Sequence, residues 1–259
     1  MHDRAEFKER RWHWYLSRVG VPVGLAIVAL AGTLYVNYDR IGTQSQSQSD
    51  SGRERESNCS NEFDGMSTGW GPDRPTVGPS DYTPQPSFNV ERHNPNFGDE
   101  RNFVQAKEAS FTDPGGWVDD LEVRAGNEYL VRIYAHNGAR DLDEYTATNT
   151  MIAVNVPACT GKSIAVSGTI SASNAYPLRI WDGIVFRSHN SIRIDLVPGS
   201  AKAISNANPN PGLQLPDRIA NEGGTAVGSS TTDGQFRGDY ANTVYVVATV
   251  RVMPAGETT

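Results

Sequence analysis

The sequence predicts an all-β protein: an antiparallel, Ig-like β-sandwich ectodomain preceded by one transmembrane helix and a disordered stalk. Three observations support this class. Apolar residues recur at every second position from Phe88 onward, Gly and Pro together supply 40 of the 259 residues, and a 20-residue stretch near the N-terminus carries no charge. Alternation with a period of two is typical of strands with one buried face, while abundant Gly and Pro favour turns over long helices.

The uncharged stretch, residues 19–38, includes the sequence VGVPVGLAIVALAGTLYV. As a helix it would span about 30 Å, the thickness of the hydrocarbon core of a bilayer. Trp12, Trp14 and Tyr38 flank it, as in the aromatic belts of membrane interfaces. Basic residues are denser before the stretch than after it, so the positive-inside rule makes residues 1–18 a cytoplasmic tail and places the C-terminal part outside.

The same stretch also fits a cleaved signal peptide. Ala29-Leu30-Ala31 forms a small-x-small cleavage site behind a short apolar region. The apolar run continues past this site to Val36, and a polar head of 18 residues is long for a signal. The uncleaved anchor is therefore the preferred interpretation, and secretion after cleavage near Ala31 is the alternative.

Residues 39–86 are predicted to form the stalk. Gln/Ser repeats and mixed charges fill the first part, which cannot bury enough apolar surface to offset the entropy of ordering. Five prolines between Pro72 and Pro86 favour an extended spacer. The alternative is that Trp70 and Tyr82 pack onto the domain as an irregular N-terminal strap.

The ectodomain is predicted over residues 87–255. Turn sequences such as NGARD, PACTGK and NANPNPG separate segments of alternating apolar residues. The clearest strands are predicted at 127–136, 150–157, 163–171 and 243–253. Many short strands with regular turns favour an antiparallel sandwich, and a closed barrel is the alternative.

Four segments of this region also carry a family likeness: NPNFGDERNFV, EYLVRIYAHNGA, VSGTISASNAYPLRIWDGIVF and VPGSAKAISN. Together they resemble an uncharacterised family of bacterial secreted and cell-surface domains. The resemblance extends over residues 88–252, and GDERNFV and VPGSA are its most specific parts. It implies a β-domain outside the cell and, because the family has no established activity, no catalytic residue.

Cys59 and Cys159 are the two cysteines of the chain. Both follow the predicted membrane helix and so lie outside, where disulfides form. The sequence leaves two possibilities open: an intramolecular bridge that pins the stalk to the domain, or thiols that are free or paired with another molecule. A catalytic thiol is disfavoured, because Cys159 lies in a turn without a local signature and His93, His136 and His189 lack metal-ligand spacing.

Acidic residues crowd the loop after the strand predicted at 127–136. Asp141, Asp143 and Glu144 could share one calcium ion, because carboxylates at alternate positions of an extended loop point the same way. The alternative is a solvated acidic loop. No other cofactor is expected.

The segment GDERNF, residues 98–103, is the sharpest local feature of the sequence. A recognition patch is one interpretation. The favoured interpretation is structural: Gly98 turns the chain, Asp99 or Arg101 holds neighbouring loops through hydrogen bonds, and Phe103 enters the core.

Two other features have structural interpretations that compete with functional ones. The tripeptide Arg-Gly-Asp at 237–239 is expected to form a tight turn into the last strand rather than an exposed integrin ligand. Trp117 and Trp181 could serve as platforms for sugar rings, but core packing is favoured for both.

These features predict a membrane-anchored extracellular interaction protein, for adhesion or envelope organisation, without catalytic activity. A carbohydrate-binding module for cell-wall or extracellular glycan is the alternative. The expected partners are the membrane, through residues 19–38, and an unknown protein or glycan outside. Net charge is −7, and residues 1–40 contribute +2, which leaves −9 for the rest. Nucleic acid is therefore excluded as a partner, because its phosphates need a basic surface.

Overall fold

The computed structural model describes Cys59 and residues 69–256, which belong to one compact unit. The predicted tail 1–18, the predicted membrane helix 19–38 and most of the predicted stalk lie outside the described residues. The described part is all-β and almost entirely antiparallel. None of its helices is long and apolar enough to cross a membrane.

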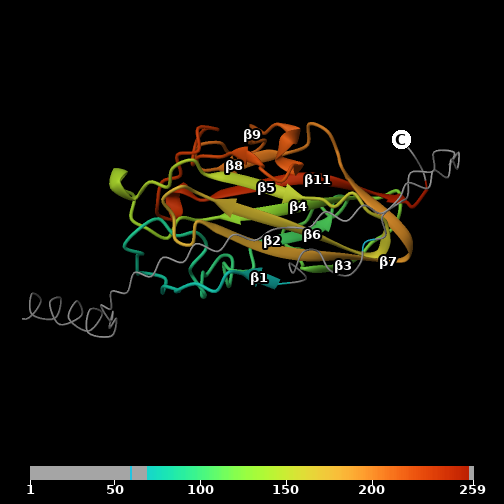
Figure 1. Cartoon of the computed structure of the whole chain (residues 1–259), viewed down its shortest axis with the longest axis horizontal. Helices are drawn as coiled ribbons and strands as arrows, with labels where there is room; N and C mark the ends of the chain where they lie inside the picture. The colour runs from blue at the N-terminus through green and yellow to red at the C-terminus, as the bar shows by residue number, and fades with distance from the viewer. Residues whose placement is uncertain (1–58, 60–68, 257–259) are drawn as a thin grey trace, which may run out of the picture. The chain divides into compact units, whose positions relative to one another are not determined.

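The described part of the chain contains eleven strands and three short 3-10 helices, which are joined by loops (Figure 1). The strands are β1 (Gly69–Gly71), β2 (Val104–Glu108), β3 (Asp120–Glu122), β4 (Glu128–Ala135), β5 (Met151–Asn155), β6 (Gly161–Ser171), β7 (Arg179–Leu196), β8 (Lys202–Ser205), β9 (Leu213–Gln214), β10 (Thr225–Ala226) and β11 (Val244–Pro254). The 3-10 helices are η1 (Asp143–Tyr145), η2 (Asp217–Ala220) and η3 (Tyr240–Asn242). The four strands predicted most clearly from alternation correspond to β4, β5, β6 and β11.

Strand β7 joins two layers of strands. Residues 179–187 pair with β6 in the order β10-β5-β6-β7, and β1 and β3 pair with this first part of β7 on its other edge. Residues 192–196 pair instead with β11, in the order β7-β11-β4-β2. Between these two parts the register with β6 shifts, and Ile192 is opposite both Gly161 and Pro254. The chain therefore turns out of one layer and into the other near residues 188–191.

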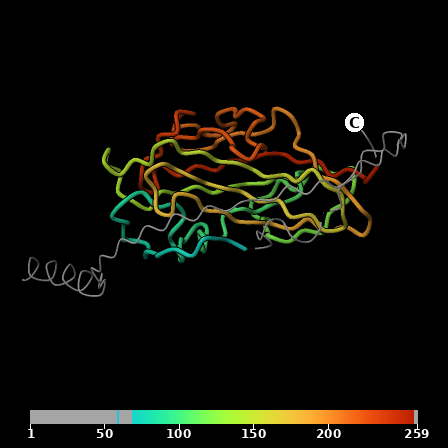
Figure 2. The backbone as a smooth tube through the Cα atoms, viewed as in Figure 1, coloured from blue at the N-terminus to red at the C-terminus, as the bar shows by residue number. Residues whose placement is uncertain are grey.

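The two layers enclose one hydrophobic core, so the fold is sandwich-like. Alternate residues of the strands face inward, as the sequence pattern predicts. The inward set includes Val131, Ile133, Val154, Ile164, Val166, Ile170, Ile184, Val246, Ala248 and Val250, all fully buried. In Figure 2, β8 and β9, in orange, lie along one side of the sandwich, and the blue-green segment that begins at β1 lies along the opposite side.

At Gly168 of β6 the two layers approach each other closely. A Cβ atom at this position would lie 2.6 Å from Cγ2 of Val104 in β2 and 2.7 Å from Cδ1 of Ile133 in β4. Both contacts belong to the opposite layer. Only a residue without a side chain fits here, because real Cβ contacts do not fall below 3.0 Å.

Replacing this glycine should test the layered packing. We expect Gly168→Val to lower the free energy of unfolding by about 1–3 kcal/mol, the usual cost of overpacking a well-packed core. Urea denaturation measures the change. Gly223→Val is the matched control, because a Cβ there meets nothing within 4 Å and the substitution should be nearly neutral. Equal stability of the two variants would contradict the contact between the layers.

Residues 69–86, the last part of the predicted stalk 39–86, are packed on the domain. Strand β1 pairs with β7, with Gly69 opposite Gly183 and Gly71 opposite Trp181. Arg74 is buried and donates from Nε to the carbonyl of Asn89. The alternative of an irregular strap describes these residues, because proline-rich chain can lie on a surface as readily as it can extend from one. We call residues 69–86 the strap.

The sandwich has two distinct ends. The first, which we call the loop end, gathers the loops 136–150, 172–178 and 227–243. These loops are bonded to one another: the backbones of Ala147 and Phe236 exchange both hydrogen bonds, and Asp239 N donates to the carbonyl of Ala139. The strap also reaches this end, where Thr83 N donates to the carbonyl of Gly138.

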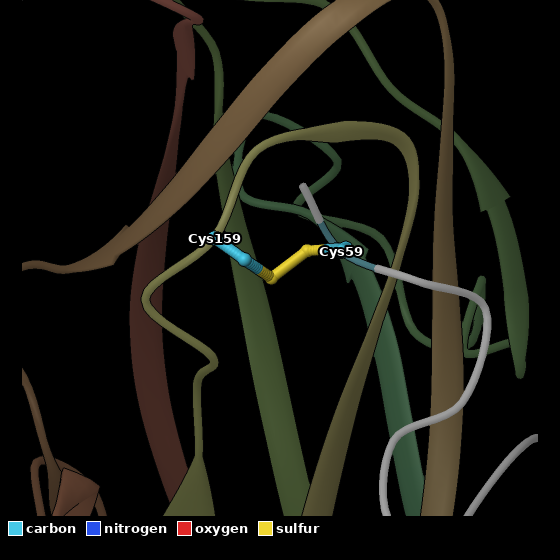
Figure 3. The surroundings of a disulfide bond; sticks show 2 residues. All are labelled: Cys59 and Cys159. Atoms are coloured by element: carbon cyan, nitrogen blue, oxygen red, sulfur yellow. A yellow bond between two sulfur atoms is a disulfide. The ribbon is translucent and has the colours of Figure 1, made fainter. Parts of the chain in front are cut away.

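The opposite end, which we call the disulfide end, holds the turn 156–160 between β5 and β6. Cys159 lies in this turn and is joined to Cys59 by a disulfide, as Figure 3 shows. Cys59 N also donates to the carbonyl of Thr160. Of the two possibilities left open by the sequence, the structure contains the intramolecular bridge.

Candidate ligand pocket

The carboxylates expected to bind calcium are paired with an arginine. Arg237 donates from Nε to Asp141 and from Nη1, at 3.0 Å, to Asp143. Glu144 makes no side-chain hydrogen bond to any described residue. Within residues 69–256 and Cys59, no group of three or more His, Cys, Asp or Glu is arranged to hold a metal ion. A guanidinium group, brought in from a distant loop, thus balances the charge of the two aspartates, and calcium binding by Asp141, Asp143 and Glu144 stays a prediction.

The same contacts show whether the Arg-Gly-Asp tripeptide at 237–239 is an exposed ligand or a turn. Arg237 is engaged by the aspartates, and Asp239 accepts hydrogen bonds from the hydroxyl of Tyr82 and the backbone N–H of Ala241. Gly238 is closely packed, since a Cβ there would clash with the carbonyl oxygens of Ala139 and Arg140. The tripeptide therefore forms a turn within the domain, as the structural interpretation expected.

The two tryptophans considered as sugar platforms are both half-buried. Trp181 lies under the strap, because a Cβ on Gly71 would meet its ring at 2.7 Å. Trp117 packs against cations, with the guanidinium of Arg132 4.3 Å and Nζ of Lys107 5.0 Å from its ring centre. Both rings are thus in contact with neighbouring residues of the domain.

In the segment GDERNF, residues 98–103, most side chains have the structural roles expected from the sequence. Gly98 has a φ of 96°, Asp99 and Arg101 form an ion pair at 2.6 Å, and Phe103 is fully buried. The residue between the pair was missed. Glu100 turns inward and is completely buried, whereas sequence alone cannot tell which of three adjacent charged residues faces the core.

Glu100 is the centre of a buried hydrogen-bond network. Its Oε1 lies 2.8 Å from Nδ1 of His136 and accepts from Nδ2 of Asn94, also at 2.8 Å. The hydroxyl of Tyr134 donates to the same oxygen at 3.3 Å. Oε2 accepts from the backbone N–H of Glu91. A buried carboxylate is tolerated only when its oxygens are satisfied in this way, so the network holds all of these groups in place.

A pocket of about 280 Å³ lies in front of this network, beside the loop end. Tyr134 from β4 and Tyr245 from β11 are directly opposite each other in the sheet and line it. The other lining residues are Asn94, Pro95, Asn96, Tyr240 and Thr243. We call this the tyrosine pocket.

The buried network supports the walls of the tyrosine pocket. The rings of His136 and Tyr240 are stacked, 4.4 Å apart and 17° from parallel. His136 is in turn fixed by Glu100. On the other side, Tyr134 is stacked on Phe97 with ring centres 4.3 Å apart. The pocket is therefore lined by aromatic rings whose positions are set from behind.

The lining of the pocket is uncharged. Burial raises the pKa of the Tyr134 hydroxyl and that of the Tyr245 hydroxyl above their usual value, so both remain neutral at physiological pH. The nearby carboxylates of Glu91 and Glu100 are 2% and 0% exposed and do not line the pocket. The arrangement can bind a molecule but presents no thiol, imidazole or carboxylate to it. Cys159, weighed as a nucleophile, has no thiol because it is in the disulfide.

A second buried carboxyl, that of Asp182 in β7, links the two layers. Its Oδ2 accepts from the backbone N–H of Val104 in β2 at 2.6 Å, and its Oδ1 accepts from the N–H of Gly183. Burial raises the pKa of Asp182 to about 8, far above the ordinary value for aspartate.

This raised pKa predicts a pH dependence of stability. The folded state holds the proton of Asp182 more tightly than the unfolded chain, so stability is highest below the unfolded pKa and is lost as pH rises through about 8. The loss is limited to about 1.4 kcal/mol per pH unit for one proton. We expect the unfolding free energy to fall between pH 5 and pH 8, and to fall less in Asp182→Asn. Asp113→Asn, at an exposed position, is the control. The prediction would be contradicted if the unfolding free energy of wild type and both variants changed equally with pH.

Comparison with known proteins identifies no relative. No protein-family model, no curated protein and no solved structure matches the chain. The resemblance of residues 88–252 to bacterial surface domains therefore stays an expectation, and the pocket itself has to indicate the function.

Proposed function

We propose that the chain is a membrane-anchored recognition protein whose β-domain acts outside the membrane and binds its partner in the tyrosine pocket, without catalysis. The tyrosine pocket is the observation that carries the proposal. It combines aromatic rings with a few polar groups, which is typical of ligand sites, and it presents no group suited to general acid, base or nucleophilic chemistry.

Two features support a location outside the membrane. The apolar run 19–38 is long enough for a membrane helix, with residues 1–18 inside. The Cys59–Cys159 disulfide suits an oxidising compartment, and such bridges are rare in the cytosol. Two packed, mostly antiparallel layers also suit an Ig-like ectodomain in the loose sense of that term.

The disulfide and the tyrosine pocket lie at opposite ends of the domain. The bridge ties the N-terminal part of the chain to the disulfide end, and the pocket lies beside the loop end. Most exposed large hydrophobic residues of the described chain also lie at the loop end: Tyr82, Leu142, Tyr176, Leu178 and Tyr240. The pocket is therefore remote from the bridge within the domain, which leaves it open to a partner.

The anchor is tested by the location and the N-terminus of the mature chain. We expect the full-length protein to remain with the membrane fraction, and protease added to intact cells to digest its domain. Mass spectrometry should find residues 1–38 still attached. A mature chain that begins at Gly32 would show instead that the protein is secreted after cleavage near Ala31.

Binding is tested with the full-length chain in a lipid nanodisc. The immobilised protein is incubated with cell-envelope material, and retained material is compared between wild type and Tyr240→Ala. We expect the substitution to abolish retention, because it removes one aromatic wall of the pocket. The control is Tyr176→Ala, because Tyr176 is exposed and does not line the pocket. This variant should retain as much envelope material as wild type. Equal retention by Tyr240→Ala and wild type would refute the pocket as the binding site.

A further inference from the structure

The tyrosine pocket has hydrogen-bonding capacity that the protein itself does not use. Among the described residues, the side-chain amide of Asn96 and the hydroxyls of Tyr240 and Tyr245 have no hydrogen-bond partner. Asn94, by contrast, is fully engaged: its amide donates to Glu100 and to Tyr134, and its oxygen accepts from two backbone N–H groups. The free groups stand at the rim of the pocket, while the engaged ones form its rigid back.

The rings offer apolar faces between these polar groups. His136 covers one face of Tyr240, and the residue remains 37% exposed, so its other face or its edge is turned to the pocket and solvent. Pro95 adds a further apolar surface. A ligand that fits must therefore carry both a flat or gently curved apolar face and hydrogen-bonding groups around its edge.

The volume and the charge of the pocket further restrict the class of ligand that it can bind. A volume of about 280 Å³ is just below the usual range for drug-sized ligands, about 300–1,000 Å³, so the pocket suits a single ring. The lining carries no charge. The guanidinium of Arg132 lies 5.6 Å from the ring centre of Tyr245, but it is packed against the rings of Trp117 and Phe97 and bonded to Gln105. An ionic group in the pocket would lose its water without meeting a counter-charge among the lining residues.

We infer that the tyrosine pocket binds one pyranose ring of a neutral glycan. This inference rests on the proposed function, since it names the ligand of the same site. A sugar ring presents a face of C–H groups, which stacks on tyrosine rings, and hydroxyl groups at its edge, which pair with the amide of Asn96 and the hydroxyls of Tyr240 and Tyr245. A proline-rich peptide fits less well, because it is recognised by a groove with several successive aromatic sites rather than by one compact pocket.

The test uses the full-length chain in a nanodisc, which avoids detergents with sugar headgroups. The probes are neutral hexose oligomers, N-acetylhexosamine oligomers, a sialylated oligosaccharide and a proline-rich peptide, each titrated by calorimetry. We expect one of the two neutral glycan classes to bind. Tyr240→Ala and Asn96→Ala should raise its Kd, the former at least about tenfold.

Controls separate loss of binding from loss of folding. Tyr176→Ala should leave the Kd unchanged, and all variants should keep the thermal midpoint of wild type within a few degrees. Binding of only the sialylated or the peptide probe through Tyr240 would overturn the neutral-glycan inference and leave the proposed function standing. The absence of binding by every probe would overturn the inference as well. If envelope material also failed to depend on Tyr240, the proposed function would fall with it.

Discussion

Replacing both cysteines, Cys59→Ala with Cys159→Ala, is expected to lower the free energy of unfolding by about 4–5 kcal/mol. The bridge closes a loop of 100 residues, and in the chain-entropy model a loop of that length restricts the unfolded chain by about 4.7 kcal/mol. Apart from the bridge, Cys59 is held to the described residues by one backbone hydrogen bond, from its N–H to the carbonyl of Thr160, and by packing against the core.

Urea denaturation with and without a reducing agent measures the effect of the bridge. Reduced wild-type protein should match the double variant, and the double variant should not respond to the reducing agent. The slope of the unfolding transition should change as well, since the unfolded chain without the bridge exposes more surface. A loss below about 1 kcal/mol would mean that the bridge contributes no entropy of loop closure in this protein.

Glu100→Gln is expected to lower the free energy of unfolding by about 3 kcal/mol. Glutamine has the shape of glutamate but only one acceptor oxygen. The two oxygens of Glu100 accept from Asn94, Tyr134 and the backbone of Glu91, and Oε1 lies 2.8 Å from Nδ1 of His136. At least one buried donor therefore loses its acceptor, and the amide group meets another donor.

The control for this substitution is Glu222→Gln, at an exposed position, which should change stability by less than about 0.5 kcal/mol. The structure also predicts a second effect of Glu100→Gln. His136 loses its fixed orientation and with it the support for the ring of Tyr240, so glycan affinity should fall even at temperatures where the variant is folded. A variant as stable as wild type would show that the network does not constrain the core.

The strands could be predicted from the sequence because burial of one face imposes a local rule. In β4 and β11, alternate residues face the core, and the period of two is visible in the chain itself. The length of β7 could not be predicted in the same way. Its 18 residues belong to two layers, and the turn near 188–191 is imposed by partners in β6 and β11.

The candidate site was largely hidden from the sequence. Three different elements supply Tyr134, Tyr240 and Tyr245, and their spacing in the sequence does not indicate a common pocket. His136 was noted only as a histidine without metal-ligand spacing. Glu100 was recognised as part of GDERNF, but its burial depends on Asn94 and on two residues of the distant β4 region.

Two features of the structure were hidden from the sequence for a common physical reason. The strap looked like a spacer because composition describes what a segment can do alone, whereas pairing of β1 with β7 and the burial of Arg74 depend on residues more than 100 positions away or on the folded surface. The pairing of the acidic loop was hidden likewise, because the cation that pairs with Asp141 and Asp143 is Arg237, about 95 positions along the chain.

The sequence by itself thus determined the all-β class, the inward faces of the main strands and the two cysteines that can be bridged, since each follows from local periodicity or from residue type. Only the tertiary structure decided that the strap belongs to the domain, that Arg237 pairs with the acidic loop and that three tyrosines share a pocket above Glu100. These features arise from contacts between segments far apart in the chain, and such contacts exist only after both layers have packed together.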